Sequence, residues 1–518
     1  EFRRVLFRSA ALLHTLTFSC EDDGVRLNLD PASLDDYRRF LAVKRLPRYR
    51  VDGECVEFPD EYASLLGVAA RQAHEVDYKP SPFLFDYQRD IVRLALRKRR
   101  FAVFADCGLG KTLIYLEYLR AVREIIPADK CLLIVAPLMV VRQVLADVRQ
   151  FYGDTFGIEQ VAARNLQGWL HGDRRCQVGI TNYEAISEGL RPGDLAGLVP
   201  DESSTLKSHY GAWGTRLIEL GAGLEWKLCL TGTPAPNDRI EYANHAVFLG
   251  QFPTVNAFLA RFFVNRGETQ NRWELKPHAL RPFYLALSHW SIFLNNPATY
   301  GWRDNVATLP PINVHVEDVP LTDEQARLAM ESTGTLFATA GGITSRSKLS
   351  QLAKGRHKGE QVATNKTAFI RDLVSSWPGE STIIWCRYNH EQEELAAAFP
   401  EAANIEGKTP QDERETLLDE FKSGARKVLI SKPRMLGFGL NLQVATRQIF
   451  SGLEDSYEEF YQAVKRSNRV GSTRPLNVHI PVTELERPMI ENVLRKARQV
   501  QQDTEEQERI FREVATCF

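Results

Sequence analysis

Residues 101–112 read F-A-V-F-A-D-C-G-L-G-K-T, an apolar run that leads into a glycine-flanked lysine and a hydroxyl. Positions 101–105 are short, apolar and rich in aromatic and β-branched side chains, which is typical of a buried strand. From Thr112 onward, T-L-I-Y-L-E-Y-L places apolar side chains at helical spacing. The order of strand, loop and helix is the context that a phosphate-binding loop requires.

The loop of this stretch has the residue types of a phosphate cradle. Gly108 and Gly110 allow backbone N–H groups to turn toward phosphate oxygens, Lys111 can reach the terminal phosphates, and Thr112 can hold Mg²⁺ through its hydroxyl. The N-terminus of the following helix adds its dipole. Ala105 stands where the strict pattern has its first glycine. The alternative is therefore an ordinary glycine-rich turn between a strand and a helix.

Composition indicates a multidomain globular enzyme. The chain has 518 residues, of which 44% are hydrophobic and 25% charged, which fits two or three domains with their own cores. The formal net charge is −1, so any nucleic-acid site must be a local basic cleft. The eight cysteines are scattered singly, without the paired spacing of a zinc site, as in a reduced cytoplasmic protein. We find no apolar stretch that approaches a membrane span.

The N-terminal part carries no chemical motif. Residues 1–9, E-F-R-R-V-L-F-R-S, resemble the translation of a sequencing adapter, so we expect them to be an artefact outside the fold and the true N-terminus to be missing. Residues 10–82 mix helical and strand-like patterns and are predicted to form an accessory region. The sequence L-F-D-Y-Q at 84–88 then opens an amphipathic helix, whose basic end at 97–100 is favoured by the helix dipole.

Strand-like and helical patterns alternate twice along the chain, which predicts two parallel sheets in an α/β fold. The polar residues of the first block follow its strands, at the edge where open α/β sheets bind ligands. The first block has predicted strands at 101–105, 131–136, 177–180, 195–199 and 227–230, and the second at 382–386, 427–430, 447–450 and 477–480.

Between and after these blocks the patterns are helical. We expect lobe one at 83–250, a helical insertion or linker at 251–311, lobe two at 312–485 and a C-terminal helix at 486–518. The aromatic side chains of the insertion are predicted to be core residues, with base stacking as the alternative.

Asp201 and Glu202 follow the apolar run at 195–199, between the phosphate loop and a T-G-T-P turn. Hydrolysis of a nucleoside triphosphate needs a carboxylate that positions the metal and a residue that orients or deprotonates water. The order of motifs therefore assigns Mg²⁺ to Asp201 together with Thr112, and water activation to Glu202. The alternative is a solvated acidic pair.

Three polar residues of the second block recur at spacings of four and three: Gln462, Arg466 and Arg469. This spacing predicts that they share one face of a helix beginning near Tyr457. Two guanidinium groups that face the phosphate loop from the other lobe could stabilise the transferring phosphoryl group as arginine fingers. In the open form we expect Arg466 to contact solvent. The alternative is a basic surface stripe.

In their order, these motifs resemble those of the superfamily-two helicases, and among them the Swi/Snf type of double-stranded DNA translocase. The resemblance spans residues 83–485. It is carried by L-F-D-Y-Q at 84–88, the loop at 105–112, I-V-A-P-L at 134–138, D-E-S-S-T-L-K at 201–207, L-T-G-T-P-A-P-N at 230–237, I-E-G-K-T at 405–409 with Arg414 and Phe421, G-F-G-L-N-L at 437–442 and the stretch 462–471.

The resemblance implies two RecA-like lobes of the P-loop NTPase class that bind ATP and Mg²⁺ between them and DNA across the opposite edge. It implies catalytic roles for Lys111, Asp201, Glu202, Arg466 and Arg469. The residues expected to bind ATP are Gln88, which would read adenine, Gly108, Leu109, Gly110, Lys111, Thr112, Gly439 and Gln462. Candidates for nucleic-acid contact or coupling are Thr181, Tyr183, Lys207, Thr231, Thr409 and Asn441.

Two departures from the family pattern concern coupling rather than chemistry. Ser203 and Ser204 replace the Ala-His of the carboxylate motif, and Ser472 stands where Gln commonly ends the arginine motif. The short insertions indicate a compact phage or bacterial member that acts in the bacterial cytoplasm or an infected host cell. We expect a monomer on double-stranded DNA that supplies force to a separate nuclease, replication or restriction partner. A strand-separating DNA or RNA helicase and an ATP-controlled clamp remain alternatives.

Overall fold

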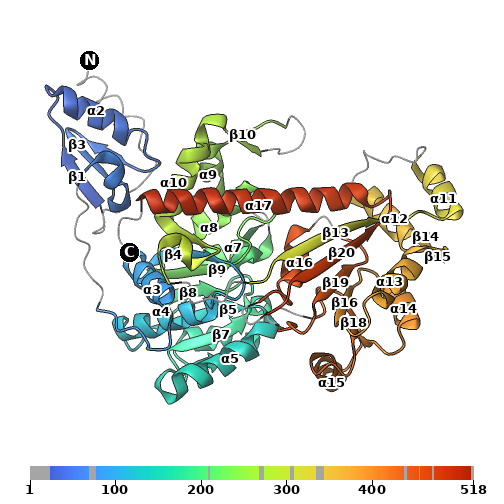
Figure 1. Ribbon diagram of the computed structural model, residues 1–518. Coiled ribbons are helices and arrows are strands. Elements are labelled where there is room, and N and C mark those ends of the chain that lie inside the picture. The colour runs from blue at the N-terminus through green and yellow to red at the C-terminus, as the bar shows by residue number, and fades with distance from the viewer. Residues whose placement is uncertain are drawn as a thin grey trace. The chain divides into compact units, whose positions relative to one another are not determined.

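Two parallel β-sheets organise the chain, one in each of its two units (Figure 1). The computed structural model describes residues 24–68, 77–207, 211–267, 273–303, 309–333, 343–436, 440–453, 456–469 and 472–514. Unit 1 comprises Glu1–Asn305 with Val500–Phe518, and unit 2 comprises Val306–Gln499.

The sheet of unit 1 has seven strands in the order β12-β4-β9-β8-β5-β7-β6, all parallel. Its central strands are apolar runs buried on both faces, as parallel sheets require. The five strands predicted for this block are confirmed. The bounds are β4 Arg100–Ala105, β5 Cys131–Ala136, β6 Glu159–Gln160, β7 Val178–Asn182, β8 Leu195–Pro200, β9 Trp226–Thr231 and β12 Ser291–Leu294.

Helices cover this sheet on both faces, and α3 packs beside α4 (Figure 1). The helices of unit 1 after the N-terminal region are α3 Asp86–Lys98, α4 Lys111–Ile125, α5 Leu138–Tyr152, α6 Ala163–Leu170, α7 Ala212–Leu220, α8 Tyr242–Phe248, α9 Val255–Phe262 and α10 Leu280–Trp290.

The segment 251–311, expected to be helical, also contributes strands. It contains the antiparallel pair β10 (Phe263–Asn265) and β11 (Trp273–Leu275), and its β12 adds to the edge of the sheet beside β4. The predicted core role of its aromatic residues agrees with the burial of Phe283, Tyr284 and Trp290. β12 is only four residues long, so the surrounding helical pattern hides it.

The N-terminal region forms a small antiparallel sheet of order β1-β3-β2 with one helix. Its elements are β1 Gly24–Asn28, α2 Leu34–Val43, β2 Arg50–Asp52 and β3 Cys55–Pro59. Tyr62 is fully buried and donates a hydrogen bond to the carbonyl of Leu285 at 2.7 Å, and Lys98 pairs with Glu61 at 2.9 Å. These contacts fasten the region to α10 and α3.

The sheet of unit 2 has six parallel strands in the order β13-β20-β19-β16-β18-β17. The four predicted strands of the second block are confirmed, and the edge strands β13 and β17 are additional. The bounds are β13 Ile312–Asp318, β16 Thr382–Trp385, β17 Ala403–Ile405, β18 Val428–Ser431, β19 Arg447–Phe450 and β20 Leu476–Val482. A short pair, β14 Arg356–His357 with β15 Glu360–Gln361, lies outside this sheet.

The helices of unit 2 are α11 Asp323–Thr333, α12 Ile343–Ala353, α13 Lys366–Ser375, α14 Asn389–Ala398, α15 Gln411–Lys422 and α16 Tyr457–Val464. The predicted C-terminal helix is α17, Arg487–Val514, which begins in unit 2 and continues into unit 1. Among the described residues, no helix is both long and apolar enough to cross a lipid bilayer.

Candidate functional site

The loop between β4 and α4 has the backbone of an anion cradle. Gly108 and Gly110 have φ angles of 88° and 68°, in the left-handed region that favours glycine. A Cβ on Gly110 would lie 2.3 Å from Nε2 of Gln88, so a side chain at this position would have to displace the amide of Gln88. The N–H of Asp106 donates to the carbonyl of Leu294 at 2.9 Å, so the edge strand β12 holds the start of the loop.

Lys111 is the first residue of α4. Its Nζ donates to the carbonyls of Ala105 and Asp106 at 2.9 Å and 3.2 Å. Burial alone would lower the pKa of Lys111, but nearby negative charge, including that of Glu202 and Asp201, raises it. The lysine is therefore held charged at the mouth of the loop.

Asp201 and Glu202 come directly after β8. β8 pairs with β9, and β9 pairs with β4, the strand that precedes the loop. Asp201 is 5% exposed, and its backbone N–H donates to Val135 at 2.8 Å. Burial, followed by the charge of Glu202, raises the pKa of Asp201 to about 7, while Lys111 opposes the shift. Glu202 has a φ of 51°, rare outside glycine, which marks a constrained backbone at this carboxylate.

A tyrosine that sequence reasoning missed, Tyr115, lies one turn into α4 on the side of Thr112 and Asp201. It is fully buried, and burial raises its pKa well above the usual value, with the charge of Asp201 adding to the shift. Thr112 is half-buried at the start of the same helix. The helical spacing of residues 112 and 115 could have indicated their shared face.

These groups fit a nucleoside triphosphate with Mg²⁺. Mg²⁺ is usually held by one or two carboxylate or hydroxyl oxygens together with substrate phosphates, and Asp201 and Thr112 supply such oxygens. The glycines of the loop, the N-terminus of α4 and the charged Lys111 suit the phosphates. The residues of unit 1 that were predicted to bind ATP and Mg²⁺ thus lie around one loop, whereas Gly439, Gln462, Arg466 and Arg469 of the same prediction belong to unit 2.

Gln88 lies against the phosphate loop and is 1% exposed. Its Oε1 accepts from the N–H of Phe85 at 3.0 Å, and its Nε2 donates to the carbonyl of Leu109 at 3.5 Å. Tyr87 donates to the same carbonyl at 3.1 Å. Phe85, which sequence reasoning did not single out, exposes 43% of its surface and stacks on Tyr87 with ring centroids 5.8 Å apart. An exposed aromatic face thus stands beside the loop, whereas the amide of Gln88 is buried and bonded to Phe85 and Leu109.

Three candidates for nucleic-acid contact or coupling are buried. Thr181 donates to the carbonyl of Val161 at 2.8 Å, Tyr183 donates to the carbonyl of Asp201 at 2.6 Å, and Thr231 donates to Oε2 of Glu202 at 3.3 Å. Their exposures are 2%, 5% and 0%. Of the two roles, burial favours coupling, because these hydroxyls have no surface to offer a phosphate.

The other candidates are placed differently. Lys207 is half-buried at the end of a short 3₁₀ turn, Ser203–Lys207. In unit 2, Thr409 accepts from the N–H of Glu406 at 2.9 Å and is half-buried. Asn441 is exposed and bonds Gln443 through both ends of its amide.

The arginine motif of unit 2 differs from the prediction. α16 ends at Val464, so Gln462, on the helix, does not share one helical face with Arg466 and Arg469, which follow it. Periodicity gave the spacing but not the end of the helix. Gly439, also predicted to bind ATP, lies outside the described residues.

Arg466 is 6% exposed, so the expectation that it contacts solvent is wrong. Its guanidinium donates to the carbonyls of Leu436 and Pro433 at 3.1 Å and 3.3 Å and lies 5.9 Å from the ring centroid of Trp385. Arg469 donates to the carbonyl of Leu440 at 3.4 Å. Backbone oxygens of unit 2 thus take the place of solvent around the guanidinium of Arg466, whereas Arg469 is half-buried.

A histidine missed from the sequence lies behind the carboxylate motif. His245, on α8, is fully buried with Nε2 3.1 Å from the hydroxyl of Ser203. Burial lowers the pKa of His245 to about 4, so its ring is neutral. The serine that replaces alanine in the motif thus has an imidazole partner from a distant helix, which no local signal reveals.

Comparisons with known families match both units. The description "Type III restriction enzyme, res subunit" covers residues 82–207, and "Helicase conserved C-terminal domain" covers residues 365–471. These matches and the relatives below confirm the predicted resemblance: the chain is similar to the superfamily-two helicases and has the motifs of their Swi/Snf type. The matches support a helicase-type ATPase, and the two parallel sheets agree with two RecA-like lobes.

Among curated proteins, p41 of Acyrthosiphon pisum secondary endosymbiont phage 1 is 25% identical over 76% of this chain and 91% of its own length. The DNA annealing helicase and endonuclease ZRANB3 of Mus musculus is 22% identical over 78% of this chain, and the ATP-dependent helicase/translocase YwqA of Bacillus subtilis is 22% identical over 73%. The chain covers only 39% and 43% of these two relatives.

A solved structure of the SWI2/SNF2 ATPase core of Sulfolobus solfataricus in complex with dsDNA is also similar to the chain. Its sequence is 18% identical, the match covers 80% of this chain and 90% of that one, and the TM-score is 0.37.

Proposed function

We propose that the protein is a motor that hydrolyses ATP to move along double-stranded DNA. The observation that carries this proposal is the contact between Thr231 and Glu202, at 3.3 Å, beside a phosphate loop with a charged Lys111. Thr231 belongs to the L-T-G-T-P-A-P-N stretch that is typical of Swi/Snf-type translocases. The contact joins this stretch to the carboxylate assigned to water activation.

In this proposal the chain's own groups divide the chemistry. Lys111 and the loop N–H groups bind the phosphates, Thr112 and Asp201 position Mg²⁺, and Glu202 orients and deprotonates the attacking water. The metal ion supplies positive charge to the transferring phosphoryl group. The list of proposed ATP ligands also includes Gln88, Gly108, Leu109, Gly110, Gly439 and Gln462, with Arg466 and Arg469 as transition-state cations.

Double-stranded DNA is proposed as the track, because the motifs are of the translocase type and two relatives carry DNA helicase or translocase names. RNA is the competing substrate, since a segment of the chain is also 28% identical over 106 residues to the ATP-dependent RNA helicase eIF4A of Candida glabrata. Phage and bacterial relatives support action in a bacterial cytoplasm or infected cell. We further propose that the protein acts as a monomer and supplies force to a separate nuclease, replication or restriction partner.

The test is ATPase activity measured with no nucleic acid, single-stranded DNA, duplex DNA and RNA side by side. Duplex DNA should stimulate ATP hydrolysis most. Equal or greater stimulation by RNA would refute the proposal that the protein moves along double-stranded DNA. Lys111→Ala should abolish turnover, while Glu202→Gln should retain bound ATP without hydrolysis. Lys130→Ala is the matched control, because Lys130 lies outside the site with 39% of its side chain exposed; its turnover should equal that of the wild type.

Movement is tested separately from hydrolysis. A translocase should displace the third strand of a triplex and fail to open a forked duplex, whereas efficient opening of the fork supports the helicase alternative. A clamp would show nucleotide-dependent DNA binding without triplex displacement. DNA binding should weaken steeply with salt, because phosphate contacts release counterions.

A further inference from the structure

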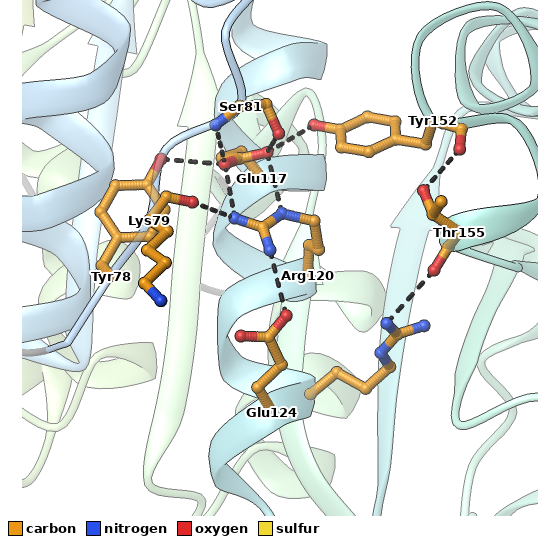
Figure 2. Close-up of polar contacts among 9 residues, drawn as sticks. Tyr78, Lys79, Ser81, Glu117, Arg120, Glu124, Tyr152 and Thr155 are labelled. Carbon is orange, nitrogen blue, oxygen red and sulfur yellow. Dashed lines mark hydrogen bonds and ion pairs between the residues drawn. The ribbon is translucent and has the colours of Figure 1, made fainter.

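α4 carries a buried carboxylate, Glu117, less than two turns after Lys111 (Figure 2). Glu117 is 0% exposed and accepts hydrogen bonds from two tyrosines and a serine. The donors are the hydroxyl of Tyr78 at 3.1 Å, the N–H and hydroxyl of Ser81 at 2.9 Å and 2.8 Å, and the hydroxyl of Tyr152 at 3.0 Å. The segment 78–81 and helix α5 are therefore both bonded to one side chain of α4.

Arg120 completes this cluster from the next turn of α4. It donates to both oxygens of Glu117, at 2.8 Å and 3.2 Å, and to the carbonyl of Lys79 at 2.6 Å. Its other contact is with the exposed Glu124 at 3.0 Å (Figure 2). Burial alone would raise the pKa of Glu117, but the hydrogen bonds from Arg120 and Ser81 outweigh it and lower the pKa. The carboxylate is ionised, and both of its oxygens accept hydrogen bonds from these donors.

The segment bonded to Glu117 leads directly to Phe85 and Gln88. We call these two residues the base side, because the base of the nucleotide is expected there. We call residues 78–85 the strap. After Ser81, Phe83 packs against Phe151 and Tyr152 of α5, with ring centroids 5.2 Å apart in both pairs. The strap ends at Phe85, the N-cap of α3. Glu117 and α5 therefore fix the path of the chain into the exposed ring of Phe85.

The other end of this arrangement touches the phosphate loop. Tyr87 and Gln88, the first residues of α3 after Asp86, both donate to the carbonyl of Leu109. The base side is thus anchored at two points, at Glu117 on α4 and at Leu109 in the loop that precedes α4. A shift of the strap would change the separation between Phe85 and the phosphate loop.

We propose that Glu117 is a positioning residue for base recognition, which sets the distance between the exposed ring of Phe85, beside Gln88, and the phosphates held by Lys111. The inference rests on the proposed use of ATP at this site, but not on DNA or translocation. With the adenine-reading role that the resemblance implies for Gln88, it predicts that ATP binding depends on this spacing more than GTP binding does.

The test compares ATP with GTP in binding and turnover by the full chain. Glu117→Gln keeps the volume and removes the charge. Ser81→Ala is a milder change that removes one hydroxyl donor, and it keeps the test valid where Glu117→Gln does not fold. Glu124→Gln is the matched control, because it removes a carboxylate from the same helix and the same arginine, with 61% of its side chain exposed. Melting curves establish that each variant is folded.

Wild type should bind ATP more tightly than GTP. Glu117→Gln should weaken ATP binding and raise its KM by about tenfold, the scale of a small misplacement of a bound substrate, and Ser81→Ala should act in the same direction by a smaller factor. GTP binding and kcat should stay within about twofold, and Glu124→Gln should match wild type. Equal loss for both nucleotides, a fall in kcat alone, or a wild type without base preference would overturn the inference. Absence of nucleic-acid stimulation would refute only the motor.

Discussion

Glu486 forms ion pairs with two buried lysines in unit 2, and its neutralisation gives a sharp prediction. Its two carboxylate oxygens each lie 2.5 Å from a lysine Nζ, that of Lys354 and that of Lys366. All three side chains are between 1% and 3% exposed. Lys354 also donates to Ser350 at 2.9 Å, and Lys366 to the carbonyl of Ser451. The cluster ties α12, α13, the segment after β19 and the start of α17 together.

Two lines of reasoning give the size of the effect. Burial alone would raise the pKa of Glu486, but the charges of Lys354 and Lys366 lower it from 4.5 to about 2. A depression of this size corresponds to about 3 kcal/mol of stability at neutral pH. Removing one partner of a buried ion pair typically costs about 3–5 kcal/mol, since the other charge is left unpaired. We therefore expect Glu486→Gln to destabilise unit 2 by about 3 kcal/mol.

The same shift sets the pH dependence. A carboxylate whose pKa is lower in the folded state stabilises the protein fully above its unfolded pKa, here 4.5, and loses this contribution as pH falls through about 2. The difference in stability between wild type and Glu486→Gln should therefore be constant from pH 7 to pH 5 and shrink below that.

Urea unfolding, followed by hydrogen exchange in peptides from unit 2, measures this difference without interference from unit 1. Glu484→Gln is the control, because Glu484 is two residues away on the surface and its replacement should change stability by less than about 0.5 kcal/mol. A loss below 1 kcal/mol for Glu486→Gln, or a difference that grows as pH falls, would refute the reasoning.

Three further predictions concern single contacts. Arg466→Ala should lower kcat by about 10³-fold or more while ATP affinity changes only a few fold, and Arg466→Lys should rescue little; because the guanidinium is buried and bonds the carbonyls of Leu436 and Pro433, melting curves must first show that unit 2 is folded, and loss of duplex binding with intact basal ATPase would contradict the prediction. Arg239 pairs with Asp503 at 2.6 Å and 3.0 Å, so a double-mutant cycle of Arg239→Gln and Asp503→Asn by thermal unfolding should show coupling of about 1–2 kcal/mol, whereas additivity would contradict it. Gly110→Ala should weaken ATP binding in calorimetry by at least about tenfold, because its Cβ would lie 2.3 Å from Gln88 at a φ of 68°; unchanged affinity would contradict it.

The sequence was most informative where the signal is local. The strands β4, β5, β8 and β9 are continuous apolar runs, and such runs are required wherever helices cover both faces of a parallel sheet. The phosphate loop was readable because its glycines and Lys111 are adjacent in the chain. These features let the fold and a candidate phosphate-binding loop be predicted together.

The sequence was least informative where a contact joins distant segments. Glu117 reads as an ordinary polar residue on a helix, and only folding brings Tyr78 and Tyr152 to it. His245 reaches Ser203 across 42 positions. The end of α16 at Val464 was missed because spacing reports a helical face and not the residue at which the helix stops. Each failure concerns a partner or a boundary rather than the type of residue.

The buried hydroxyls around the carboxylates bear on how hydrolysis would be coupled to the movement that we propose. Tyr183 follows β7 and holds the backbone of Asp201, whereas Thr231 ends β9 and holds the side chain of Glu202. The two acidic residues therefore accept hydrogen bonds from hydroxyls that belong to different strands, or follow them, in one sheet. Because neither hydroxyl is exposed, a ligand on the surface could influence the carboxylates only by moving β7 or β9 or the segments that follow them. Coupling through the backbone of these strands, rather than through a side chain shared by DNA and ATP, is the arrangement that their burial favours.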